Sequence, residues 1–323
     1  MRSPKSWVSL LISAAVGVMV FAVANVMTYN MSGYFERERD YHDEVADFFT
    51  RPNARAVFAG DSHVAQLDNS LLADDAYNIA WGGDSLREIY AKLRYLTWRH
   101  ARIDTLFLTA DDHMFGNGRM ESSNRAFVDE YLLLTWSPYG LEQGWPSAAL
   151  GTVPLFNDDF VQYLKKEISV SFKREKSGAI HQDQDAWLSL TDAERERMAR
   201  RTGEEDHTGI GANREPFIWY GRIAALAREH GIRIVAVLYP AHEAYVDSVS
   251  AQAHAAVKAE LASLRIQVLD FRYAFKEPSY FSDPDHVSRK GAIALLRLLG
   301  ARTGRHLLAD TVPPAAARAQ AAR

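Results

Sequence analysis

The sequence predicts an α/β fold in which helices cover both faces of a parallel sheet. The chain has 323 residues, of which 47% are apolar, so it is long enough to bury a sizeable core. Short apolar runs typical of buried strands recur along it, and each run is preceded by a segment with helical spacing. The four strands that we expect are residues 54–60, 104–110, 232–240 and 266–271.

The segments between these strands place apolar residues at 3.6-residue spacing, as amphipathic helices do. Strands that alternate with helices are typical of parallel sheets, because a crossover helix must return the chain to the same edge. The expected helices are residues 85–101, 216–231 and 248–264, and a last one is expected within residues 281–300.

The N-terminal region contains an uncharged, mostly apolar segment, residues 7–27, after Arg2 and Lys5. Its length is about what a bilayer core requires, so we expect a retained membrane anchor, residues 1–29. The alternatives are an export signal cleaved after residues 22–24 and a buried core helix. Positive charge before the segment places the N-terminus in the cytoplasm. We therefore expect a single-pass protein of the inner (cytoplasmic) membrane whose remaining chain is periplasmic, or otherwise extracytoplasmic.

The rest of the chain divides into regions that differ in amino-acid composition. A helical pattern with an aromatic stripe follows the anchor, and the alternating α/β pattern begins after it. That pattern is interrupted by about 100 aromatic-rich and then charged residues, which we interpret as a lid or substrate-binding insert. The C-terminal end, "PPAAARAQAAR", has no apolar residue larger than Ala and is expected to be disordered. The parts are a juxtamembrane helix (30–53), a catalytic domain (54–305) with its insert (116–214), and a tail (306–323).

Composition excludes several function classes. A formal charge of -4 and a pI near 6.3 provide no basic field, so nucleic acid is not an expected partner. The chain has no Cys, which excludes disulfides, thiolate metal sites and a Cys nucleophile. No motif with metal-ligand spacing is present, so we expect neither a metal nor another cofactor.

The first chemical motif follows the first expected strand directly. Gly60, Asp61 and Ser62 lie at its carboxyl end, where ligands and catalytic groups of parallel sheets collect. Ser62 could be a nucleophile, with backbone N–H groups of the following helix beside its hydroxyl. The alternative is a turn that caps a helix, because Gly turns the chain and Asp or Ser caps helices.

The second motif places Asp283 three residues before His286, in a loop ahead of the last expected helix. A serine nucleophile needs a neutral imidazole to accept its proton, and the imidazole needs a carboxylate that fixes its tautomer. The alternative is a surface loop in which Asp283 caps the helix and His286 is solvated. Taken together, the motifs predict Ser62 as nucleophile, His286 as base and Asp283 as its orienting acid.

With "YNIAWGGDSL" at residues 77–86, these motifs resemble three of the four sequence blocks of the SGNH, or GDSL-type, hydrolases. Residues 60–62 match the nucleophile block, Asn78 and Gly83 match the second block, and residues 283–286 match the last. The resemblance implies a three-layer α/β/α fold with a flavodoxin-like parallel sheet and a Ser-His-Asp triad that cleaves or transfers acyl esters. It also implies an oxyanion hole formed by the N–H groups of Gly83 and of the serine.

The third block of that family, usually Gly-x-Asn-Asp, is altered. The family's Asn donates to the oxyanion, whereas this chain has Asp111, Asp112 and His113 after the second expected strand. An ionised carboxylate facing an oxyanion would raise the barrier. Three alternatives stay open: His113 is the donor, one of the two acids is protonated, or the donor comes from the insert.

In its topology the chain resembles anchored members of the family that modify envelope polymers, such as alginate O-acetylation and teichoic-acid D-alanylation proteins. This resemblance implies an extracytoplasmic polysaccharide as substrate and an MBOAT-type membrane protein as acyl donor. His242 and Glu243, after the third expected strand, and Asn78 are candidate substrate-binding residues, with a solvated loop as the alternative for the first two.

Two classes of function therefore remain. The first is an anchored serine esterase or O-acyltransferase that acts on O-acyl, chiefly O-acetyl, groups of a polysaccharide, and a lipase-like or thioesterase activity is its variant. The second is a catalytically degenerate domain that binds glycan or acts as a scaffold in an acylation complex. The altered third block is the signature of the second class.

Overall fold

We describe a computed structural model of the chain, which covers residues 4–121, 124–137, 139, 153–157, 160–161, 163–165 and 184–311. Two compact units are present. The first comprises Met1–Asp43 and Pro138–Gly178, and the second comprises Glu44–Ser137 and Ala179–Arg323. The second contains the sheet, so the candidate site is described within it.

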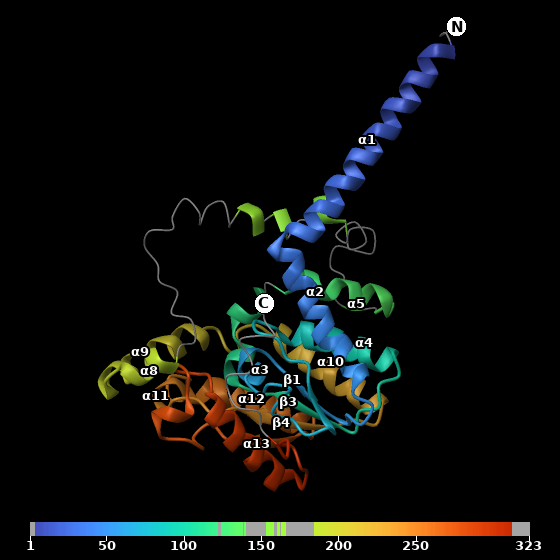
Figure 1. Cartoon of the computed structure of the whole chain (residues 1–323). Helices are drawn as coiled ribbons and strands as arrows, with labels where there is room; N and C mark the ends of the chain where they lie inside the picture. The colour runs from blue at the N-terminus through green and yellow to red at the C-terminus, as the bar shows by residue number, and fades with distance from the viewer. Residues whose placement is uncertain are drawn as a thin grey trace. The chain divides into compact units, whose positions relative to one another are not determined.

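A five-stranded parallel sheet forms the centre of the second unit (Figure 1). Its spatial order is β2-β1-β3-β4-β5, which is the order of flavodoxin-like, doubly wound folds. The register aligns Phe58 with Phe107, and their rings stack at 4.6 Å. This confirms the expected α/β class. The strands are β1 (Ala56–Ala59), β2 (Ala76–Asn78), β3 (Thr105–Thr109), β4 (Arg233–Leu238) and β5 (Gln267–Asp270).

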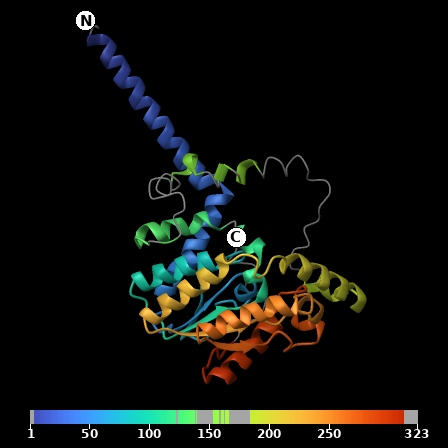
Figure 2. The same ribbon diagram turned by 180° about the vertical axis from the view of Figure 1, so that it is seen from behind.

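Helices cover both faces of the sheet. Right-handed crossovers place the helices that follow β2, β3 and β4 on one face, and Figure 2 shows them in front of the strands. The opposite face packs against the last helix, whose Leu295, Leu296 and Leu299 join Phe58 and Val235 in one buried cluster. The covering helices are α4 (Leu86–Trp98), α10 (Glu215–Glu229), α12 (Ala251–Ser263) and α13 (Arg289–Thr303).

Each strand lies within one of the four expected segments except β2, which we did not anticipate. Its three residues are too short to show a period, but they extend the sheet by pairing with β1 from Ala76 opposite Ala56. The strand matters for function because it leads directly into the turn that carries Gly83.

The described part of the insert is helical. The short helix α5 (Asp129–Leu134) packs on α4, where Tyr131 and Tyr95 stack at 4.5 Å. Helix α9 (Asp192–Asp206) packs on α11 (Glu243–Val246), which follows β4. The insert is therefore placed partly at the carboxyl end of the sheet. Of the rest of the expected lid, Pro138–Gly178 belongs to the first unit, and much of it lies outside the described residues. A further short helix, α8, spans Gln184–Ser189.

The first unit holds the N-terminal helix α1 (Pro4–Met31). Within it, Trp7–Met31 is long and apolar enough to cross a membrane, judged by length and composition. Helix α2 (Gly33–Ala46) follows, and a 3-10 turn, η1 (Asp47–Thr50), continues it. The aromatic stripe of the expected juxtamembrane helix serves packing, since Tyr34 and Phe35 are buried. The expectation of a disordered tail from residue 306 is wrong for its first residues, because Leu307 is buried and Leu308 pairs with Leu72. The rest of the expected tail, from residue 312 onward, lies outside the described residues.

Candidate active site

Ser62 is the first residue of α3 (Ser62–Ala65), at the carboxyl end of β1. The turn before it is tight, because a Cβ on Gly60 would lie 2.1 Å from a methyl carbon of Val64. Asp61 caps the helix, since its Oδ1 accepts a hydrogen bond from the backbone N–H of His63 at 3.2 Å. Asp61 is thus a helix cap, and Ser62 is partly exposed at the carboxyl end of the strand, where its role as nucleophile stays a prediction.

Asp283 and His286 are in contact. The Nδ1 atom of His286 donates to both oxygens of Asp283 at 2.9 Å. Asp283 also accepts the backbone N–H groups of Asp285 and His286, which fixes the loop. The Nε2 atom of His286 is buried and has no hydrogen-bond partner among the described residues. The structure therefore joins the predicted base to its acid, but it contains no hydrogen bond between His286 and Ser62 in this part of the chain.

A second carboxylate, Asp285, was not anticipated. Its Oδ1 lies 3.2 Å from Nδ1 of His286, and its Oδ2 lies 3.0 Å from Nε2 of His63. The other ring nitrogen of His63 lies 2.9 Å from Oδ2 of Asp111. A continuous buried chain of charges therefore runs from Asp111 through His63 and Asp285 to His286.

The charges in this chain shift each other's pKa values. Burial by itself would lower the pKa of His286, but Asp285 and Asp283 outweigh burial and raise it to about 9. Burial would likewise lower the pKa of His63, but Asp61, Asp111 and Asp285 hold it well above its usual value. Since a ring that faces a carboxylate at each nitrogen can donate to both only as imidazolium, His63 is charged at neutral pH. The two imidazoliums in turn overcome the effect of burial on Asp285 and keep its pKa low.

Asp61 is the centre of another buried cluster. Its Oδ2 accepts from Nε2 of His113 at 2.7 Å and from Arg119 at 2.9 Å. Burial would raise the pKa of Asp61, but Arg119 and His113 lower it well below its usual value. One ring nitrogen of His113, which we considered as an oxyanion donor, therefore binds the acid next to Ser62, whereas its Nδ1 atom has no hydrogen-bond partner among the described residues.

The two acids of the altered third block also have other partners. Asp111 accepts from His63 and Thr109 with one oxygen and from the backbone N–H of Tyr239 with the other, at 2.6 Å. Asp112 lies within 3.3 Å of His254 and Arg272, from α12 and the segment after β5. Because these contacts engage both oxygens of each acid, we assign Asp111 and Asp112 to joining neighbouring segments rather than to the oxyanion.

Gly83 lies in a turn that only glycine adopts easily, with a φ of 84°. Asp84 anchors this turn through a fully buried ion pair with Lys92 at 2.7 Å. Burial raises the pKa of Asp84 to about 6 despite Lys92. Asn124, from the insert, donates to the carbonyl of Gly82 and to Asp84, each at 2.9 Å. The turn of the expected oxyanion hole is therefore held from two sides.

The expected substrate-binding residues have different surroundings. Asn78 is buried and holds a loop, because its amide donates to the carbonyls of Val64 and Leu67. His242 caps α11 and Glu243 is its first residue, and both line a cavity of about 320 Å³, together with Tyr273 and Lys276. Burial lowers the pKa of His242, so its ring is neutral at pH 7. His242 and Glu243 thus remain candidates for contact with a ligand. Asn78 holds a loop, and it also lines a second cavity, so its role in substrate binding stays a prediction.

Two groups of side chains bring potential metal-ligand atoms within 4.8 Å of one another: Asp61 with His63 and His113, and His63 with Asp285 and His286. In both groups the carboxylates already pair with imidazoles, and Arg119 adds a positive charge beside Asp61. A metal would have to displace these pairs, so the arrangement suits proton transfer better than metal binding.

Sequence reasoning missed four buried or partly buried contributors: His63, Asp285, Arg119 and Asn124. His63 and Asp285 are sequence neighbours of the motif residues Ser62 and His286, so their position beside a motif could have identified them as candidates. Arg119 and Asn124 lie in the insert and carry no motif.

No protein-family model matches the sequence, and no curated protein sequence does. Among solved structures, the chain is similar to a provisionally named acylhydrolase from Bacteroides fragilis, with a TM-score of 0.36 and 12% sequence identity. The similarity covers 81% of this chain and 95% of that one.

Proposed function

We propose that the protein is a membrane-anchored serine esterase or acyltransferase of the SGNH type, with an extracytoplasmic polysaccharide as its substrate. The observation that carries the proposal is the pair formed by Asp283 and His286, whose buried Nε2 has no partner among the described residues. His286 lies beside the nucleophile segment, since its ring centroid is 5.0 Å from that of His63, the neighbour of Ser62.

In the proposed reaction, Oγ of Ser62 attacks the carbonyl carbon of an acyl ester, and His286 accepts the hydroxyl proton. The N–H groups of Ser62 and Gly83 stabilise the negative oxygen of the tetrahedral intermediate. The ester C–O bond breaks, and His286 returns the proton to the departing alcohol oxygen. Water or a sugar hydroxyl then attacks the acyl-serine by the same steps, which regenerates Ser62. Asp283 holds Nδ1 of His286 protonated, so that Nε2 faces the reaction.

Topology supports the choice of an envelope polymer. The apolar helix at Trp7–Met31 would anchor the chain in the inner membrane, and the positive residues before it favour an extracytoplasmic catalytic domain. An MBOAT-type membrane protein would be a suitable acyl donor, because the proposed site lies outside the compartment where activated acyl groups are made.

The test is labelling of the full chain by a fluorophosphonate probe, which forms a covalent bond only with an activated serine. We expect labelling of the wild type, none of Ser62→Ala, and a large loss with His286→Ala. Ser70→Ala is the matched control, because Ser70 is exposed and should leave labelling unchanged. Labelling that persists in Ser62→Ala would refute the assignment of the nucleophile.

One observation favours the second candidate, a non-catalytic scaffold. Because the pKa of His286 is about 9, this residue is mostly protonated at pH 7 and cannot then accept a proton. The pH dependence of fluorophosphonate labelling distinguishes the two candidates. Labelling of an enzyme should increase as pH rises towards 9, whereas a scaffold should stay unlabelled at every pH.

A further inference from the structure

A cavity of about 390 Å³ opens beside the proposed nucleophile. This volume lies within the usual range of small-molecule sites, roughly 300–1,000 Å³. Gly82 lines the cavity, and a Cβ on Gly82 would lie 3.9 Å from Cβ of Ser62. Ala65, one turn after Ser62 on α3, also lines it. The cavity therefore adjoins the segment that carries Ser62, although Ser62 is not itself among the lining residues.

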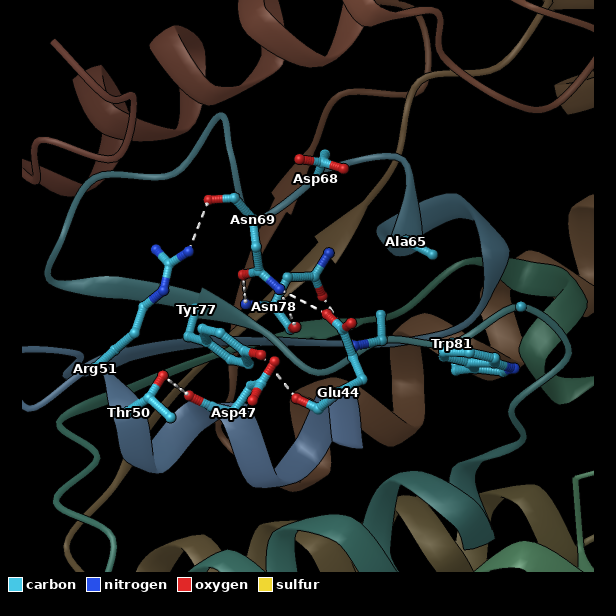
Figure 3. A pocket seen from close by; sticks show the side chains of 12 residues that line it. Glu44, Asp47, Thr50, Arg51, Ala65, Asp68, Asn69, Tyr77, Asn78 and Trp81 are labelled. Atoms are coloured by element: carbon cyan, nitrogen blue, oxygen red, sulfur yellow. Dashed lines mark hydrogen bonds between the residues drawn. The ribbon is translucent and has the colours of Figure 1, made fainter. Parts of the chain in front are cut away.

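The charge of the lining is unbalanced. Three carboxylates, Glu44, Asp47 and Asp68, line the cavity, and Arg51 is the cation among its lining residues (Figure 3). The guanidinium of Arg51 lies over the ring of Tyr77, at 5.4 Å from its centroid. The cavity is therefore negative at neutral pH, and an anionic sugar such as a uronate would be repelled from it.

Hydrogen bonds hold the polar wall in place. The amide of Asn69 donates to Glu44 at 2.6 Å and to the carbonyl of Asn78 at 3.0 Å, and it accepts the backbone N–H of Asn78 at 2.8 Å. Tyr77 donates its hydroxyl to the carbonyl of Glu44 at 2.7 Å. Oxygen and nitrogen atoms in fixed positions suit a ligand that has several hydroxyl groups, because little side-chain freedom is lost on binding.

An aromatic ring completes the lining. Trp81 is partly exposed, lines the cavity and precedes Gly82 in the sequence. Figure 3 shows Trp81 at one end of the set and Arg51 with Thr50 at the other. The apolar face of an indole packs against the C–H face of a sugar ring, while polar groups opposite take its hydroxyls.

We propose that this cavity binds the sugar unit of the polysaccharide on which Ser62 acts, and that this unit is uncharged or carries an amino group. Polyuronates are excluded by the carboxylates of the lining. The inference rests on the proposed function for the role of Ser62, but binding in the cavity can be measured without catalysis.

The experiment uses the full chain in detergent micelles with the Ser62→Ala substitution, so that binding is separated from turnover. Cellotetraose, the tetramer of chitosan and tetragalacturonate are titrated by calorimetry. We expect the neutral and the amino tetramer to bind and tetragalacturonate not to bind. In the triple variant Glu44→Gln, Asp47→Asn, Asp68→Asn, the preference for the amino tetramer over tetragalacturonate should fall by about tenfold or more, as expected for a few partly exposed charges.

The triple variant should keep its fold, because Glu44→Gln and Asp68→Asn retain the oxygens that accept from Asn69 and from the N–H of Ser70, and Asp47 is exposed. Asp310→Asn, which removes an exposed carboxylate outside the cavity, is the matched control and should change nothing. The proposal is overturned if tetragalacturonate binds as well as the other two, if none binds, or if the triple variant keeps the wild-type preference. If the fluorophosphonate probe does not label the wild type but the binding preference is the expected one, the proposed enzymatic function is refuted and the proposed sugar site stands.

Discussion

The substitution Asp285→Asn should move the pH dependence of the reaction to lower pH. In the wild type, Asp285 is the largest of the influences that raise the pKa of His286 to about 9, so about one molecule in a hundred has a neutral His286 at pH 7. Asn removes the charge but keeps an oxygen facing His63. With Asp283 still in place, we expect the pKa to fall by about one to two pH units, which increases the neutral fraction at pH 7 about tenfold or more.

The assay is kcat/KM for nitrophenyl acetate from about pH 6 to pH 10, since this parameter reports the free enzyme's ionisations. The variant should be faster than the wild type near pH 7. Above about pH 9 it should be slower, because a weaker base accepts a proton less readily. Asp310→Asn, next to the exposed His306, is the control and should superimpose on the wild type. If the variant's profile coincides with that of the wild type, Asp285 does not govern His286 and the reasoning fails.

The ionisation of His286 should also affect the stability of the folded chain. A pKa that is higher in the folded chain than its ordinary value of 6.5 stabilises the fold fully below pH 6.5, and this contribution is lost as pH rises through about 9. The thermal midpoint of the wild type should therefore decrease over that interval, and Asp285→Asn should decrease less over it. An equal decrease in both proteins would argue against the assignment.

Three further predictions concern the site and its supports. Ser62→Ala, His286→Ala and the double variant should reach the same floor of esterase activity, because groups that act as a unit are not additive; a double variant far below both would contradict this. Lys92→Met should lower the free energy of unfolding by about 3–5 kcal/mol in urea titrations, since it removes the cation that is paired with the buried carboxyl group of Asp84. Gly60→Ala should destabilise by about 1–3 kcal/mol and reduce fluorophosphonate labelling, since a Cβ there overlaps a valine methyl group; unchanged labelling would show that the turn can shift freely.

The sheet could be predicted because its signals are local. An apolar run such as residues 232–240 marks a buried strand without knowledge of its neighbours, and the flavodoxin-like order followed from the resemblance. The three-residue strand β2 shows no period, so its pairing with β1 was not visible. Motif residues 283–286 were likewise readable, since acid and base stand in one loop.

The wider site could not be predicted, because its partners are distant in sequence. Asp112 contacts Arg272, 160 residues further along the chain, and His63 contacts Asp285, 222 residues away. A carboxylate such as Asp111 therefore looked like an obstacle to the oxyanion when it was considered alone. In the structure, Asp111 pairs with the imidazolium of His63, and a single sequence does not reveal this pairing.

The contribution of Arg119 and Asn124 has a consequence for how the protein folds. Asp61 and Asp84 are fully buried, yet each has a partner in the segment after β3 as well as nearer ones. If Asp61 and Asp84 were buried before this segment packs against them, their negative charges would be incompletely compensated. The carboxyl edge of the sheet should therefore form late in folding, after the strands have paired. Native-state hydrogen exchange should then report a lower opening energy for residues 82–84 than for the centre of β3. The part of the molecule proposed to do chemistry would thus be the last to form and the first to open.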